Sequence, residues 1–262
     1  MKRLQARQLS YRVGDRVILD NICLDIKAGD NIALLGANGA GKSTLMKLLL
    51  GLLAPHTGEV LIDGQPMRAM KRRAVARQIA YVPQSHVPSF PFSVAHIVGQ
   101  GRLPTVGLGR LPTVGLGHGP SRDDKTSVQQ ALTGLGILHL SERPYTELSG
   151  GERQLVLIAR AMVQRANTII LDEPVTGLDY GHQLRLLALL KRLAAQGISI
   201  LSSTHRPEHA LASANRVLVL HEGRLIADGA PHDVIDSALM ARLYQVAVEQ
   251  IDTNGHRFFT PC

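Results

Sequence analysis

Residues 36–44, with the sequence GANGAGKST, have the residue types and spacing of a loop that binds phosphate groups. The glycines let backbone N–H groups turn toward one ligand without a Cβ in the way. Lys42 supplies a positive charge that suits the β- and γ-phosphates of a nucleotide, and the Ser43 hydroxyl suits Mg²⁺. A glycine-rich turn that fits the pattern by chance is the alternative. The predicted nucleotide-binding residues of this loop are Gly36, Ala37, Asn38, Gly39, Ala40, Gly41, Lys42, Ser43 and Thr44.

Two adjacent acids, Asp172 and Glu173, follow the apolar run TIIL at residues 168–171. A buried parallel strand carries the residues at its carboxyl end into the ligand crevice of an α/β sheet. There the two carboxylates can divide the work: Asp172 would help to hold Mg²⁺, while Glu173 would polarise a water molecule for attack on the γ-phosphate. An acid after a strand also often caps the next helix, which is the alternative for this pair.

A third segment, LSGGERQ at residues 148–154, has the pattern of a helix start. Ser149 and Glu152 have the spacing of a capping box, in which each side chain bonds the other residue's backbone N–H. A helix start with two glycines, Gly150 and Gly151, is also a site for an anion. The two interpretations are compatible, although one Ser149 hydroxyl cannot serve its own helix and a phosphate equally well.

The rest of the chain alternates between patterns typical of strands and of helices. An alternating N-terminal segment and a hairpin closed by Asp63-Gly64 predict a small antiparallel sheet. From about residue 84 to residue 147 the pattern changes to loops and helices. Strands and helices then alternate again, and the turns Glu222-Gly223 and Asn254-Gly255 predict hairpins. This order favours an α/β fold with a mainly parallel sheet and crossover helices.

The composition bounds the function without fixing it. The chain has 262 residues, a formal net charge of +8, and only two cysteines, which favour a reducing compartment. The charge fits nucleic acid, an anionic membrane face or simply a solvated surface. The basic run at residues 68–77 has no interleaved aromatic residues for base stacking, so we expect no nucleic-acid partner. Neither a secretory signal nor a membrane-spanning apolar stretch is evident.

An octapeptide is repeated without change. GRLPTVGL occupies residues 101–108 and again residues 109–116. Two adjacent copies are too few and too short for a solenoid. We interpret one copy as an insertion in the helical region, which should cost well under ~1 kcal/mol in loop-closure entropy.

With these motifs in order, the chain resembles the ATP-binding subunits of ABC transporters over nearly its whole length. Four shorter matches add to the three motifs: Tyr11, Gln84 in YVPQ, Asp179 in GLD, and His205 in SSTH. The resemblance implies that Tyr11 stacks on adenine, that Gln84 touches Mg²⁺, that Asp179 belongs to a dimer-contact loop, and that His205 senses the γ-phosphate. Tyr11 could instead be an ordinary strand tyrosine.

The resemblance implies a P-loop NTPase core with an N-terminal antiparallel β-subdomain and an inserted α-helical subdomain. The expected ATPase domain covers residues 1–246, its helical subdomain about residues 85–160, and a β-hairpin tail residues 247–262. Glu173, His205 and Gln84 are then the expected catalytic residues, and Ser43, Gln84 and Asp172 the metal ligands. Tyr11, the loop 36–44, Ser149, Gly150, Gly151 and Asp179 would bind ATP.

In this family one chain's glycine loop faces the Ser-Gly-Gly helix start of another, so the resemblance implies a homodimer that holds ATP and Mg²⁺ between its chains. It also implies permease subunits in the membrane, an indirect solute-binding partner, and a peripheral position on the cytoplasmic face. Details such as FPFSV at residues 90–94 resemble importers of iron chelates, haem, vitamin B12 or molybdate. An exporter ATPase is the alternative. DNA-repair relatives need a coiled-coil insertion, and translation-type relatives carry two cassettes; this sequence has neither feature.

Overall fold

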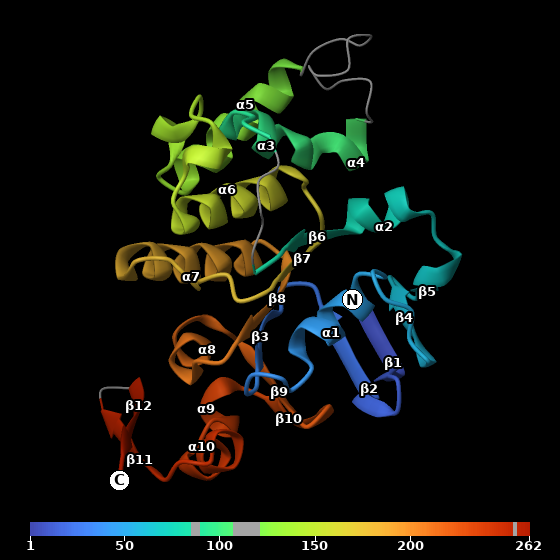
Figure 1. The fold of residues 1–262 in the computed structure, drawn as a ribbon, viewed down its shortest axis with the longest axis vertical. Helices are drawn as coiled ribbons and strands as arrows, with labels where there is room; N and C mark the ends of the chain where they lie inside the picture. Colours follow the sequence, from blue (N-terminus) through green and yellow to red (C-terminus); the bar gives the residue numbers. More distant parts are fainter. Residues whose placement is uncertain (85–89, 107–120, 254–255) are drawn as a thin grey trace. The chain divides into compact units, whose positions relative to one another are not determined.

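The computed structural model describes residues 1–84, 90–106, 121–253 and 256–262 (Figure 1). The chain divides into two compact units, one of Met1–Met70 with Leu187–Cys262 and one of Lys71–Leu186. Two predictions fall partly or wholly outside the described residues: the Asn254-Gly255 turn, and the second octapeptide with the end of the first. The α/β class with an antiparallel N-terminal sheet is confirmed.

The first unit is built on a sheet in which four neighbouring strands have the order β10-β9-β3-β8. The elements of the sheet and its helices are β3 (Asn31–Leu35), α1 (Lys42–Leu49), β8 (Ser199–Thr204), α8 (Pro207–Ser213), β9 (Arg216–His221), β10 (Arg224–Gly229), α9 (Pro231–Val234) and α10 (Ser237–Tyr244). Strand β3 pairs in parallel with β8 and with β9, whereas β10 returns antiparallel through the predicted Glu222-Gly223 turn. All five residues of β3 are buried, as expected for a parallel strand covered on both faces.

A second sheet of the same unit has the order β2-β1-β4-β5 and is antiparallel. Its strands are β1 (Lys2–Val13), β2 (Arg16–Lys27), β4 (Thr57–Ile62) and β5 (Gln65–Pro66), followed by the short helix η1 (Met67–Ala69). Asp63 and Gly64 both have positive φ and close the β4–β5 hairpin, as predicted. In this sheet β1 brings Tyr11 opposite Leu19 of β2.

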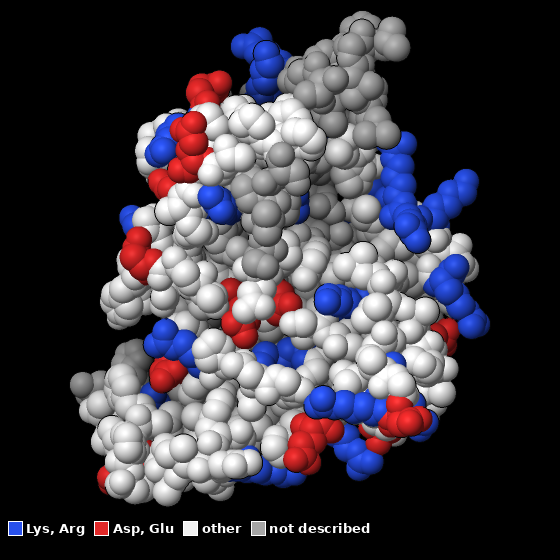
Figure 2. All heavy atoms as spheres, viewed as in Figure 1, with Lys and Arg blue, Asp and Glu red and all other residues white. Residues whose placement is uncertain are grey.

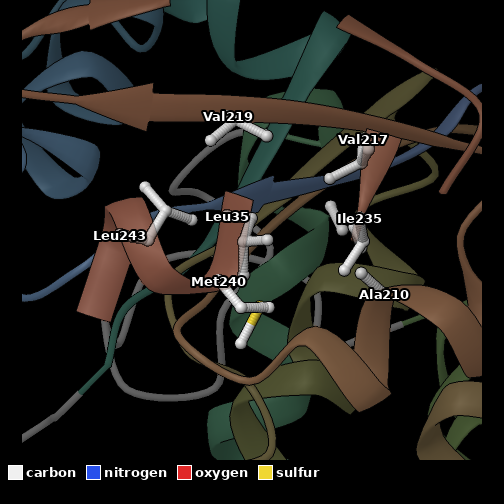
Figure 3. Close-up of a cluster of buried hydrophobic side chains, with 8 residues drawn as sticks. Leu35, Ala210, Val217, Val219, Ile235, Met240 and Leu243 are labelled. Atoms are coloured by element: carbon white, nitrogen blue, oxygen red, sulfur yellow. The ribbon is translucent and has the colours of Figure 1, made fainter. Parts of the chain in front are cut away.

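One face of β3 and β9 is covered by the C-terminal helices (Figure 3). The buried cluster there consists of Ala33, Leu35, Ala210, Val217, Val219, Ile235, Met240 and Leu243. Burying a side chain the size of Leu or Met contributes about 1.5–3 kcal/mol, so this cluster is a major part of the unit's stability.

The tail hairpin, β11 (Val248–Thr253) and β12 (His256–Pro261), packs Val248 and Phe259 against the cluster. Arg257 holds this hairpin in place, because its guanidinium donates to the carbonyls of His232 and Ile235.

The second unit has a parallel strand pair, β6 (Ile79–Val82) with β7 (Thr168–Leu171), and a set of helices. The helical elements are α2 (Arg72–Gln78), α3 (Val94–Gly99), η2 (Gln100–Arg102), α4 (Leu103–Val106), α5 (Arg122–Gly134), η4 (Leu138–Leu140), η5 (Tyr145–Glu147) and α6 (Gly150–Val163). Helix α7 (Tyr180–Ala195) begins in this unit and ends in the other. Strand β7 is buried along its whole length, which confirms the strand predicted before the two acids.

The described part of the first octapeptide fits closely into the helical region. A Cβ at Gly101 would lie 2.2 Å from the carbonyl oxygen of Arg160, so only glycine fits there. Arg102 forms a buried ion pair with Asp124, with 2.9 Å between Nε and Oδ1, and its Nη1 donates to the carbonyl of Val163. Burial alone would raise the pKa of Asp124, but the bonds from Arg102 and Ser121 outweigh it and lower that pKa.

Candidate nucleotide site

The glycine loop begins where β3 ends and is shaped by close backbone contacts. A Cβ at Gly36 would lie 2.3 Å from the carbonyl oxygen of Leu220. Gly41, at φ +106, precedes α1 and would place a Cβ 2.9 Å from Cδ2 of Leu19. Both positions therefore require glycine, one for space and the other for space and backbone conformation. Gly39 lies at φ +82 with open space around it. This geometry leads the loop backbone directly to the start of α1, where its N–H groups can face a phosphate.

Lys42 lies at the centre of this loop. Its side chain is 7% exposed, and its ammonium donates to the carbonyls of Gly36 at 2.7 Å and Ala37 at 3.0 Å. Loop carbonyls thus hold a full positive charge beside the N-terminal end of α1, which carries no acidic residue in its first turn. The resulting field favours a polyanion. Ser43 and Thr44, the next residues of α1, are half-buried.

Tyr11 lies near the loop through the small sheet, because its strand partner Leu19 is the residue that Gly41 approaches. The half-buried ring of Tyr11 meets the ring of His56 edge to face, with 5.3 Å between ring centroids. His56 is tied to the same strand twice: its N–H donates to the carbonyl of Ser10, and its Nδ1 accepts from the N–H of Arg12. His56 was not predicted, because contacts between strands cannot be read from the spacing of residues.

His205 lies at the same sheet edge as the loop. Leu35 and Thr204 are register partners on the parallel strands β3 and β8, so Gly36 and His205 both follow at the carboxyl ends of paired strands. His205 is exposed, while its carbonyl accepts a 2.6 Å bond from the hydroxyl of the half-buried Tyr244 in α10. Burial raises the pKa of Tyr244 to about 12, so this hydroxyl remains a donor at neutral pH.

In the second unit, predicted site residues also follow the carboxyl ends of two paired parallel strands. Val82 and Leu171 are register partners on β6 and β7, and the N–H of Asp172 continues the ladder by donating to the carbonyl of Val82. Asp172 is only 4% exposed. The next residue, Glu173, has φ +46, the left-handed region that costs a non-glycine residue about 1–2 kcal/mol.

Two side chains of the second unit donate to the Glu173 carboxylate. The Gln84 amide, two residues beyond β6, donates to Oε2 at 3.2 Å. The Thr176 hydroxyl donates to the same oxygen, also at 3.2 Å. The sequence placed Gln84 and Glu173 in one site only through the resemblance, and Thr176 was not predicted at all. The structure brings all three together.

The Ser-Gly-Gly segment begins α6 as predicted. Both bonds of the capping box are present: the N–H of Glu152 donates to the Ser149 hydroxyl at 3.2 Å, and the N–H of Ser149 donates to Glu152 at 2.7 Å. Bonds from the backbone N–H and the side chain of Ser149 to the Glu152 carboxylate lower the pKa of Glu152. Ser149 and Gly150 are exposed, and a Cβ at Gly150 would meet nothing within 4 Å.

The predicted dimer-contact loop lies against this helix start. A Cβ at Gly151 would be 2.9 Å from the carbonyl oxygen of Gly177, so Gly151 and the segment 177–179 are in close contact. The exposed Asp179 accepts hydrogen bonds from the backbone N–H and the ring of His182, and these lower its pKa. The structure therefore brings two separately predicted segments together within one unit.

The basic run around α2 has a structural role in this unit. Figure 2 shows Lys and Arg side chains at the edge where Figure 1 draws α2. In this run Arg73 and Arg77 both donate to the carbonyl of Pro104, at 2.9 and 2.8 Å. Two of the four basic residues at 71–77 therefore connect α2 to α4. All four are exposed, which favours the interpretation of this run as a solvated surface.

The predicted metal ligands are chemically suited to Mg²⁺. A hydroxyl, a carboxamide oxygen and a carboxylate are hard oxygen donors of the kind that Mg²⁺ prefers. Gln84 uses its NH₂ group toward Glu173, which leaves its amide oxygen for a cation. Within the described ranges, no group of three or more His, Cys, Asp or Glu could hold a metal by itself.

Comparison with known proteins agrees with this chemistry. The model of the ABC transporter family matches residues 19–176. The chain is 35% identical to the hemin import ATP-binding protein HmuV of Rhodococcus jostii, over 95% of this chain and 82% of that protein. It is 34% identical to the petrobactin import ATP-binding protein FpuC of Bacillus anthracis, over 98% and 92%. Among solved structures, an inward-facing metal-chelate type ABC transporter matches with a TM-score of 0.81 and 31% identity, over 100% of this chain and 97% of that one.

One further observation concerns the membrane. Among the helices of the described residues, none combines the length and the apolar character needed to cross a bilayer.

Proposed function

The chain belongs to the ABC transporter family of ATP-binding proteins, whose members are ATPases, and we propose that it is the ATP-hydrolysing subunit of an importer. One observation carries the assignment of the catalytic base. Glu173, directly after a buried parallel strand, is held at φ +46 with its carboxylate bonded to the Gln84 amide. A carboxylate aimed in this way can accept a proton from water as that water attacks a γ-phosphate.

Each predicted residue has a defined task in this proposal. The N–H groups of the loop 36–44 and the ammonium of Lys42 bind the phosphates, and Tyr11 stacks on the adenine. Bound Mg²⁺ would neutralise charge on the β- and γ-phosphates, with Ser43, Gln84 and Asp172 as its protein ligands. His205 contacts the γ-phosphate. Glu173 orients the attacking water and takes its proton.

We propose that two copies of the chain bind ATP between them. The support is that Ser149 and Gly150, at the start of α6, are exposed, and that a helix start favours an anion. The glycine loop of one chain would face Ser149, Gly150 and Gly151 of the other, with Asp179 at the contact. ATP then stabilises the closed dimer because it contacts both chains, and hydrolysis releases it.

We also propose the transport partners, and the import proteins among the relatives support them. The chain would dock on permease subunits at the cytoplasmic face of the membrane, and a solute-binding protein would deliver the cargo. The domain division proposed here is an ATPase domain at residues 1–246, its helical subdomain at about residues 85–160, and a tail at residues 247–262. The helical subdomain and Gln84 would transmit opening of the dimer to the permease.

We propose a metal-containing cargo such as haem, an iron–siderophore complex, vitamin B12 or a related solute. The support is that the hemin and petrobactin import proteins match over nearly the whole chain. An exporter ATPase shares the same chemistry and is the alternative.

Steady-state ATP hydrolysis by the purified chain tests this proposal. Glu173→Gln should lower turnover by roughly 10² or more while ATP still binds, since only the general base is lost. Lys42→Ala should instead weaken ATP binding itself, which calorimetry measures. Normal hydrolysis by the Glu173 variant would place the base elsewhere, and unchanged ATP affinity of the Lys42 variant would contradict the role of the loop.

A further inference from the structure

The turn that follows Glu173 closes on Glu173 itself. The backbone N–H of Thr176 donates to the carbonyl of Glu173 at 3.1 Å, which forms a four-residue turn. The Thr176 hydroxyl then donates to Oε2 of the Glu173 side chain at 3.2 Å. One residue therefore fixes both the backbone and the carboxylate of Glu173.

The bond from the Thr176 hydroxyl also restricts the side chain of Glu173, whose backbone is in the left-handed region. A glutamate side chain has three rotatable bonds, and the αL backbone by itself does not select one rotamer. Gln84, which follows β6, donates to Oε2, and Thr176, three residues after Glu173, donates to the same atom. Two donors from separate segments restrict rotation of the carboxylate plane.

We propose that Thr176 is a positioning residue for the general base, and that its hydroxyl helps to hold the Glu173 carboxylate in one orientation. This inference rests on the proposed function, because it assumes that Glu173 is the base.

The side chain of Thr176 is exposed, so the bond is partly screened and its loss should not unfold the protein. Thr176→Val removes the hydroxyl but keeps the shape and the backbone bond. We expect kcat for ATP hydrolysis to fall about tenfold, the scale of one hydrogen bond to a charged group, with KM for ATP unchanged. Thr176→Ser keeps a hydroxyl and should recover most of the wild-type kcat.

A double variant separates positioning from a general structural effect. In the Glu173→Gln background there is no base to orient, so Thr176→Val should cause no further loss of turnover. The melting temperature of Thr176→Val, measured alongside, should stay within a few degrees of the wild type. The inference is overturned if Thr176→Val hydrolyses ATP like the wild type, if Thr176→Ser is as slow as Thr176→Val, or if the loss persists in the double variant.

These results are distinguishable from failure of the proposed function. If Glu173→Gln alone retained wild-type turnover, the base assignment would be wrong and the inference would fall with it. If Glu173→Gln were inactive while Thr176→Val kept full activity, the base assignment would stand and only the positioning role would be lost.

Discussion

The loop after β3 and the turn after β7 solve the same problem by different means. Each follows a fully buried parallel strand, and each must present binding groups at the strand's carboxyl end. The first uses glycine: Gly36 and Gly41 bring backbone within distances that no Cβ allows, so the loop's own N–H groups become the ligands. The second uses a strained glutamate, which Gln84 and Thr176 hold by its carboxylate.

The difference shows where the stabilising interactions must come from. A binding group made of backbone is positioned by the chain path, so close packing of glycine is sufficient. A catalytic carboxylate is positioned by other side chains, and the strain of its backbone has to be offset by them. The second unit accordingly relies on side-chain bonds in several places, including Arg102 with Asp124 and Ser149 with Glu152.

The largest effect should come from the buried ion pair. Arg102→Ala leaves Asp124 without its cation in a buried site, so the free energy of unfolding should fall by about 3–5 kcal/mol. Urea unfolding measures this loss. Arg110→Ala is the matched control, because Arg110 is the same residue of the second octapeptide and its removal leaves the Arg102–Asp124 pair intact.

Only point substitutions can distinguish the two copies, since deleting either octapeptide yields the same sequence. Equal losses from the two arginine variants, or a loss only in the double variant, would contradict a unique role for Arg102. The stability of the second unit would then not depend on the Arg102–Asp124 side-chain pair.

A smaller effect should follow from adding one methyl group to the glycine loop. Gly36→Ala would place its Cβ against the carbonyl of Leu220, so we expect about 1–3 kcal/mol of destabilisation and weaker ATP binding. Gly134→Ala serves as a control, because Gly134 lies in α5 with nothing within 4 Å of its Cβ position. That variant should be neutral or slightly stabilising. A Gly36 variant as stable as the control would remove the close-packing half of the comparison.

The smallest effect should be at the capping box. Ser149→Ala removes the acceptor for the N–H of Glu152, and we expect a loss of about 1 kcal/mol in unfolding free energy. Ser149→Asp keeps an N-cap acceptor and should recover that stability. A stability unchanged by the alanine variant would mean that the helix start does not depend on its side-chain bonds.

The sequence predicted features that local chemistry determines. The buried strands, the capping box and the Glu222-Gly223 hairpin follow from apolar runs and turn residues, and each is present. Glu222 and Glu173 even share the same φ of +46, yet only Glu222 was predicted to turn, because a glycine follows it. No glycine follows Glu173, so residue type did not predict its positive φ.

Contacts between distant segments were the features that the sequence could not supply. Thr176, His56 and the Arg102–Asp124 pair depend on which segments meet in space. Threonine, histidine and arginine are common enough that neither their types nor their spacing mark such contacts. Gln84 was found only because an ordered set of motifs resembled a family.

Sedimentation velocity of the Glu173→Gln variant, with and without saturating ATP and Mg²⁺, tests the central claim most directly. Two copies that hold nucleotide between them should shift from monomer to dimer when ATP is added, because the variant binds ATP without hydrolysing it. The same variant with Lys42→Ala added should stay monomeric. A Glu173→Gln protein that binds ATP and yet remains strictly monomeric would contradict the account.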